Sequence, residues 1–203
     1  MIKMYFNPNS TVEIKERHLP HWRQDGVGYF VTFRLADSIP QAKLASWKLE
    51  KESFLQRYPK PWSWKEEVEY HRWFTNQIES YLDRGMGSCL FCKKEISKIV
   101  ANTLRYFDDV RYCLGGWVIM PNHVHSVITP VLGYELSRIL HSLKSYSATS
   151  INELLGRKGR VWQSETYDQI LRSAVHHHRV EEYIRRNPEK AGVEVHHASW
   201  LEV

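Results

Sequence analysis

The segment that decides the fold is Arg111–Thr129, which reads RYCLGGWVIMPNHVHSVIT. Its two halves, Arg111–Met120 and His123–Thr129, are rich in the β-branched and aromatic residues that favour strands. Pro121 and Asn122 lie between the halves, and both residue types are suited to a tight turn. The segment therefore predicts a β-hairpin.

The second strand of this hairpin carries two histidines, His123 and His125. Side chains two residues apart on a strand project from the same face, so both imidazoles can bind one divalent metal ion. The alternative is a half-buried or surface pair that binds no metal. The spacing alone is compatible with both interpretations.

Outward from the hairpin, the chain shows one more strand pattern and several helical ones. Gly28–Leu35, GYFVTFRL, has the composition of a strand, and a short extended segment is expected at Val161–Trp162. Elsewhere apolar residues recur every three to four positions, which is the period of an amphipathic helix. The predicted helices are Pro40–Tyr81 with a break at Pro59–Pro61, Lys93–Phe107, Glu135–Leu155, and His176–Arg186 with a stop at Asn187 and Pro188.

Length and composition fit one folded domain. A chain of 203 residues is long enough for a substantial core and too short for two ordinary domains. Hydrophobic residues make up 42% and charged residues 25%, which excludes a disordered protein. We expect a single domain over residues 1–203, with a helical insertion at about 40–85.

The charge balance favours a polyanionic partner. The net charge is +5 with 28 Lys and Arg against 23 Asp and Glu, and the excess is sharper between Arg138 and Arg179. This region is the candidate nucleic-acid face, because neutralising backbone phosphates provides most of the sequence-independent affinity for DNA. A solvated surface is the alternative for each candidate phosphate contact: Lys144, Arg157, Lys158, Arg160 and Arg172.

Cysteine usage and the apolar runs indicate the compartment. Only Cys89, Cys92 and Cys113 occur, an odd and sparse set that fits a reducing environment. The start, MIKMYFNPNS, lacks the apolar core of a signal peptide, and no apolar run approaches the ~18 residues that span a bilayer. We expect a cytoplasmic, nucleoid-associated protein without a membrane partner.

A second candidate pair lies near the end of the last predicted helix. Tyr183 and Asn187 are four residues apart, which places the phenol and the amide side by side on one helical face. A nucleophile beside a metal ligand would have this spacing. A core tyrosine packed near a helix stop is the alternative.

Three segments in this order and spacing resemble the signature of REP-associated tyrosine transposases, which are single-tyrosine HUH nucleases: MPNHVHSVITP at 120–130, WQSETYDQILR at 162–172 and EEYIRRNPEKAG at 181–192. PHWRQDGVGYFVTFRLADSIP at 20–40 and LDRGMGSCLF at 82–91 also resemble stretches of one branch of that family. The resemblance extends from about residue 17 to residue 193.

The resemblance implies the fold and the site. The fold would be α+β, a ferredoxin-like antiparallel sheet with helices on one face, as in HUH nucleases. The family's metal ligands correspond to His123 and His125, and its nucleophile corresponds to Tyr183. Asn187 would complete the metal site, although related insertion-sequence transposases have a glutamine at that position. Tyr146, on the helix after the hairpin, is the competing candidate for the nucleophile.

The resemblance also implies the activity: cleavage and rejoining of single-stranded DNA at REP-type hairpins, with Mg²⁺ or Mn²⁺ and a 5′-phosphotyrosine intermediate. Such a transposase serves DNA transposition and recombination, and we expect a monomer rather than a homodimer. One alternative is a domesticated hairpin-binding protein that no longer transposes. Another is a metallohydrolase of small molecules, which would need further His or Asp ligands.

Overall fold

The hairpin predicted from the sequence lies at the centre of the sheet. The computed structural model describes residues 5–16, 20–59, 64–70, 73 and 76–200. Strands β4 (Tyr112–Ile119) and β5 (His123–Pro130) pair antiparallel, with Val118 opposite His125. The backbone N–H of Met120 donates to the His123 carbonyl across the tight turn, at 2.9 Å. The hairpin is thus confirmed.

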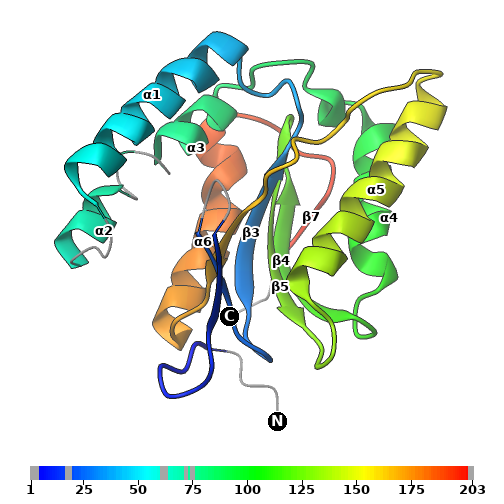
Figure 1. Ribbon diagram of the computed structural model, residues 1–203. Helices are drawn as coiled ribbons and strands as arrows, with labels where there is room; N and C mark the ends of the chain where they lie inside the picture. Colours follow the sequence, from blue (N-terminus) through cyan, green and yellow to red (C-terminus); the bar gives the residue numbers. More distant parts are fainter. Residues whose placement is uncertain (1–4, 17–19, 60–63, 71–72, 74–75, 201–203) are drawn as a thin grey trace.

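Three further strands complete a five-stranded antiparallel sheet with the order β6-β3-β5-β4-β7 (Figure 1). Strand β3 (Tyr29–Arg34) is the strand expected after Gly28 and pairs with β5. The edge strands are β6 (Tyr167–Ile170) and β7 (Ala198–Ser199), neither of which the sequence pattern predicted. Only an isolated bridge between Leu35 and Trp162 corresponds to the extended segment expected there.

Helices cover both faces of this sheet (Figure 1). Helices α4 (Lys94–Tyr106) and α5 (Leu136–Leu154) pack on the face that presents Val31 and Val124. Helix α6 (Ala174–Ala191) packs through Val180 and Ile184 on the opposite face. The expected α+β class with an antiparallel sheet is confirmed, but the helices are not confined to one face. Strand β5 is buried along its whole length, so both of its faces have to be covered.

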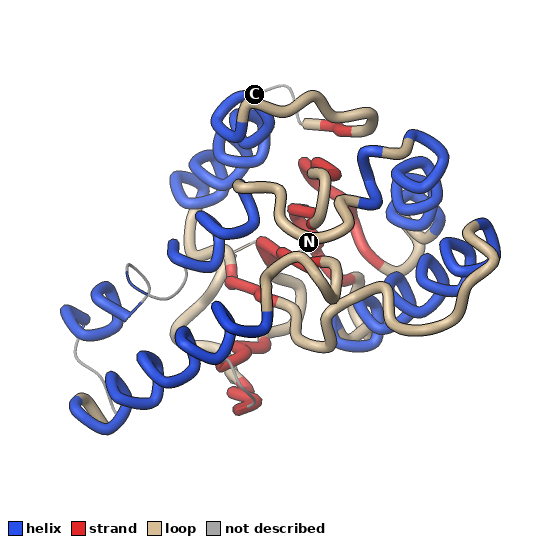
Figure 2. Tube along the Cα trace, turned by 90° about the horizontal axis from the view of Figure 1, so that it is seen from above, coloured by secondary structure: helices blue, strands red, loops and turns tan. Residues whose placement is uncertain are grey.

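The region expected to be a helical insertion contains three helices: α1 (Gln41–Arg57), α2 (Trp64–Tyr70) and α3 (Asn76–Asp83). The second expected helix is therefore two separate helices. Figure 2 shows α1 extending away from the sheet, and none of its residues is buried. The assignment of the whole chain to one domain stays a prediction.

The N-terminal part forms a small separate ribbon. Strands β1 (Glu13–Glu16) and β2 (Pro20–Arg23) pair antiparallel in a two-stranded sheet that the sequence did not predict. The Arg23 guanidinium joins this ribbon to the large sheet through two hydrogen bonds to the Asp168 carboxylate, at 2.6 and 2.9 Å. Across the described ranges, no helix combines the length and the apolar character needed to cross a membrane.

A bulge in β4 receives the helix that covers the second face. The register shifts between Leu114 and Trp117, which leaves Gly115 and Gly116 in the bulge. The buried Glu181 carboxylate of α6 accepts the Gly116 backbone N–H at 3.0 Å and lies 3.2 Å from the His177 ring. A side chain at position 116 would overlap this carboxylate. The bulge therefore sets how closely α6 approaches the sheet.

Candidate active site

The two histidines of β5 converge on one point. His123 and His125 project toward the α6 face and are both fully buried. Their Nε2 atoms are 3.0 Å apart. The second nitrogen of each ring, Nδ1, forms a hydrogen bond with a side-chain oxygen: His123 Nδ1 lies 2.7 Å from Asn122 Oδ1, and His125 Nδ1 lies 2.8 Å from Thr32 Oγ1. Such outer contacts orient metal-binding imidazoles.

These contacts define the tautomers. Asn122 donates its amide N–H to the Met86 carbonyl at 2.9 Å, which directs Asn122 Oδ1 to His123 as an acceptor. His123 therefore carries its proton on Nδ1 and accepts at Nε2, so His125 donates from its own Nε2. The Thr32 hydroxyl then donates to His125 Nδ1. A hydroxyl can also accept a hydrogen bond. If the Thr32 hydroxyl rotates to accept from His125 Nδ1–H, His125 carries its proton on Nδ1, and its Nε2 lone pair becomes free beside that of His123.

Burial also keeps both rings neutral. It lowers the pKa of His123 to about 3. The pKa of His125 is held well below its ordinary value, first by burial and then by the charges of His123 and Lys190. Metal ions bind the neutral imidazole, so the two rings are in the required protonation state at neutral pH.

Helix α6 brings Tyr183 to the histidines. The Tyr183 hydroxyl lies 3.5 Å from His125 Nε2, and its ring packs edge-on against His125 and Phe30. Tyr146, the competing candidate, is 65% exposed on α5. Since α5 packs on the other face of the sheet, the sheet separates Tyr146 from the His pair.

Asn187 is buried on the same helix without a hydrogen-bond partner. Its side chain is 1% exposed, and neither its oxygen nor its nitrogen forms a hydrogen bond with the described residues. Leaving a buried amide unpaired costs about 1–3 kcal/mol, so Asn187 is a candidate ligand for a bound ion. The expected helix stop at Asn187 was wrong, because α6 continues through Pro188 to Ala191. It ends where Gly192 adopts the left-handed conformation at φ 63°.

Two carboxylates of α3 face Tyr183. The Tyr183 pKa is raised well above its ordinary value, first by burial and then by the charges of Glu79 and Asp83. The Asn187 amide, which is near the phenol without meeting hydrogen-bond geometry, opposes this increase. Burial raises the pKa of Glu79 to about 7, while Lys190 and the Tyr183 hydroxyl act to lower it. Tyr183 is therefore a neutral phenol beside a carboxyl group that titrates near neutral pH.

Sequence reasoning missed Glu79 and Asp83. Their four-residue spacing on one helix face was the only local signal. Lys190 of α6 donates to Asp83 at 2.9 Å and so connects the helix of Tyr183 to α3. Thr32 was also missed, because its contact with His125 results from the pairing of β3 with β5.

The donor set fits a metal only if an amide takes part. Among the residues that the structure describes, no group of three or more His, Cys, Asp or Glu side chains could hold a metal ion. A metal held by the two histidines would therefore need a ligand of another type, for which the unpaired Asn187 amide oxygen is the candidate. A hydrolase site built from further His or Asp ligands is not present in these ranges.

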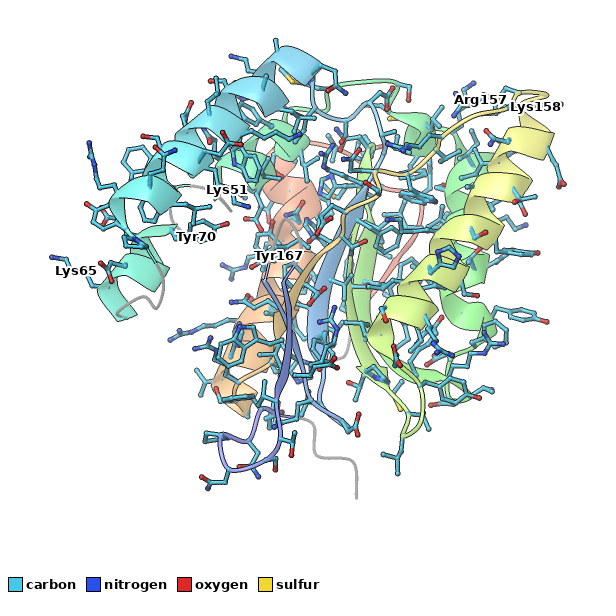
Figure 3. All side chains as sticks on the ribbon, in the orientation of Figure 1. Lys51, Lys65, Tyr70, Arg157, Lys158 and Tyr167 are labelled. Carbon is cyan, nitrogen blue, oxygen red and sulfur yellow. The ribbon has the colours of Figure 1, made fainter. Side chains whose placement is uncertain are left out.

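The five candidate phosphate contacts do not form one cluster. The Lys144 ammonium donates to the carbonyls of Gln163 and Ser164 and to Thr166 Oγ1, so its three N–H groups are already used. Arg157 and Lys158 are exposed beyond the end of α5 (Figure 3).

Arg160 is exposed and lines a cleft beside β6, whereas Arg172 stacks over Trp22 at 5.8 Å just before α6 begins. Trp162 is a core residue: it is 4% exposed, and its indole N–H donates to Ser147 Oγ at 2.9 Å. The candidates with exposed charge in the candidate nucleic-acid face are therefore Arg157, Lys158, Arg160 and Arg172.

Residues 90–187 match the protein family described as "Transposase IS200 like". This segment, slightly less than half of the chain, is similar to the IS200-like transposase family. The IS200-like segment contains His123, His125 and Tyr183 and ends at Asn187. It excludes α1, α2 and α3, which precede it. The similarity is to a family of enzymes of the nuclease and transposase type.

One solved structure with distant similarity is described as a REP-associated tyrosine transposase bound to a REP hairpin. The sequence identity is 18% and the TM-score 0.45, and the comparison covers 86% of this chain and 75% of the other. No curated protein gives a significant match.

Proposed function

We propose that this protein is a metal-dependent tyrosine nuclease of the IS200-like transposase family that cuts and rejoins single-stranded DNA through Tyr183. The observation that carries the proposal is the approach of the Tyr183 hydroxyl to His125 Nε2, at 3.5 Å, beside a second histidine. A phenol, two neutral imidazoles and an unpaired amide thus meet at one buried point, although they come from two separate elements.

The metal ligands in this proposal are His123, His125 and Asn187. A bound Mg²⁺ or Mn²⁺ would polarise the scissile phosphate and stabilise the charge that develops on it. Asn122 and Thr32 hold the two imidazoles in the orientation that binding requires.

In the cleavage step, the Tyr183 oxygen forms a bond to phosphorus and the bond from phosphorus to the 3′ oxygen breaks. The products are a 5′-phosphotyrosine and a free 3′ hydroxyl, and the leaving oxygen takes up a proton from solvent. An ordinary phenol, with a pKa of ~10, is protonated at neutral pH and has to lose its proton to attack. Glu79 is the carboxylate that faces Tyr183 and is the proton acceptor in this scheme. Attack by the 3′ hydroxyl on the phosphotyrosine rejoins the strand.

The substrate that we propose is single-stranded DNA beside a REP-type hairpin. The support comes from the three segments that resemble REP-associated transposases, and from the exposed basic side chains of Arg157, Lys158 and Arg160. Contacts of this kind neutralise phosphates irrespective of sequence. We propose a monomer that acts on the nucleoid in the cytoplasm.

The test is formation of a covalent adduct. The protein is incubated with labelled hairpin DNA from its own genomic neighbourhood and Mn²⁺, and the adduct is resolved on a denaturing gel. We expect an adduct that is lost with a chelator and in Tyr183→Phe, and retained in the control Tyr146→Phe. An adduct that survives in Tyr183→Phe and is lost in Tyr146→Phe would refute the assignment. Tight hairpin binding without any adduct would favour the domesticated DNA-binding protein.

A further inference from the structure

A cleft of about 480 Å³ lies beside the proposed active site. Residues of α1, α2 and α3 form one wall, and the segment before β6 together with Tyr167 forms the other. Figure 3 shows Tyr70 on the helical side and Tyr167 on the sheet side. The volume is in the range of small-molecule sites, about 300–1,000 Å³.

The cleft is continuous with the residues around Tyr183. Thr32, which contacts His125 at 2.8 Å, lies in its lining, and so does Glu79, which faces Tyr183. An occupant of the cleft would therefore lie next to the Tyr183 hydroxyl. The family segment begins at residue 90, so the helical wall lies outside it.

One cation in the cleft has no counterion. Arg34 lies directly opposite His123 in the sheet and forms one hydrogen bond, to Ser38 Oγ at 2.9 Å. The residues that the structure describes give it no carboxylate partner, and burial lowers its pKa to about 10. A half-buried guanidinium without an acid is costly, unless a ligand supplies acceptor oxygens.

Further features of the lining match a nucleotide. Lys48 and Arg160 add positive charge, whereas Glu79 and Glu165 are the acidic residues of the lining. Trp47 is half-buried on the helical wall, where Lys51 Nζ lies over its ring at 5.1 Å from the centroid. An indole that lines a cleft is suited to stack on an unpaired base, and the neighbouring ammonium adds positive charge for a phosphate.

We propose that this cleft binds one nucleotide of single-stranded DNA next to the bond that is cut, with Trp47 stacking on the base and Arg34 contacting a phosphate oxygen. The inference rests on the proposed single-stranded DNA substrate. It assigns the helical segment outside the IS200-like region a direct part in holding that substrate.

The test compares two strands of equal length: a fluorescent oligothymidylate and an abasic strand with the same phosphates. Binding is measured by anisotropy in the presence of chelator, so cleavage does not contribute. Trp47→Ala weakens binding of the oligothymidylate about tenfold and leaves the abasic strand unchanged. Arg34→Gln weakens both strands, because both carry the phosphate. Trp47→Phe restores most of the affinity, since it keeps an aromatic plane.

Trp73→Ala is the matched control, because Trp73 is 61% exposed and does not line the cleft. Equal weakening of both strands by Trp47→Ala, or no weakening, would overturn the cleft assignment while leaving the nuclease proposal intact. If the wild-type protein did not bind the oligothymidylate, the cleft assignment would fail, whereas the nuclease proposal fails only if no adduct forms on hairpin DNA. Loss of base-dependent binding in Trp47→Ala supports the cleft whether or not an adduct forms.

Discussion

Replacing Gly116 by alanine tests how the β4 bulge positions the helix of Tyr183. A Cβ at this position would overlap Glu181 Oε2 and lie 2.8 Å from Glu181 Cδ. The carboxylate has to move, and it then loses the hydrogen bond from the Gly116 backbone N–H. Both groups are buried, so no water replaces that bond without further rearrangement.

Three contributions determine how much Gly116→Ala lowers the free energy of unfolding. Overpacking costs about 1–3 kcal/mol, and an unpaired buried N–H costs about another 1–3 kcal/mol. Restricting the unfolded chain by a glycine-to-alanine change returns about 0.4–1 kcal/mol. The net loss for Gly116→Ala is about 3 kcal/mol, which lowers the melting temperature of a protein of this size by about 6–12 °C.

The assay is thermal unfolding of Gly116→Ala, with Gly192→Ala as the control. Gly192 has a φ of 63° and open space around it, so its substitution costs only the left-handed conformation, about 1 kcal/mol. In a Glu181→Ala background, the Gly116→Ala change should cost almost nothing, because the overlap is gone. An undiminished loss in that background, or wild-type stability of Gly116→Ala, would refute the reasoning.

Three other variants test the site. Because the pKa of Glu79 is about 7, its proton-accepting carboxylate forms only as the pH rises through that value, so adduct formation by the wild-type protein should rise with it. In Glu79→Gln this rise should disappear, and an unchanged pH–rate profile would contradict the role of Glu79. Asn122→Ala should weaken Mn²⁺ binding, measured by titration calorimetry, about 10–100-fold through the loss of the His123 contact, and wild-type affinity would argue against that role. Replacing Arg157 and Lys158 together by alanine should weaken binding of all single strands alike and make the slope of log K against log salt shallower by about 1.4; an equal slope would remove both residues from the DNA face.

The fold could be predicted where it is locally encoded. The β4–β5 hairpin and the helices follow from turn residues and apolar period, which act over neighbouring positions. Strand β6 has only four residues and forms through its pairing with β3, in which Tyr167 lies opposite Thr32. The conformation of such a short strand depends on a partner that is distant in the sequence, so the local residue pattern does not predict it.

The candidate site could likewise be predicted only where neighbouring residues determine it. The spacings within the pairs His123 and His125, and Tyr183 and Asn187, predicted two half-sites. Their approach depends on the packing of α6 on the sheet, which no spacing describes. Lys144 shows the reverse problem, since a lysine in a basic stretch resembles a phosphate contact until three protein oxygens are found around its ammonium.

The position of Glu79 in the sequence affects how the pH dependence of the proposed reaction can evolve. The proposed metal ligands and the tyrosine lie within residues 90–187, whereas the carboxyl group that titrates near neutral pH lies in α3, outside that segment. In the proposed mechanism, metal binding and proton removal are therefore encoded in separate stretches of the chain. Exchanging the helical segment between relatives would shift the pH at which the enzyme works while the metal centre stays as it is.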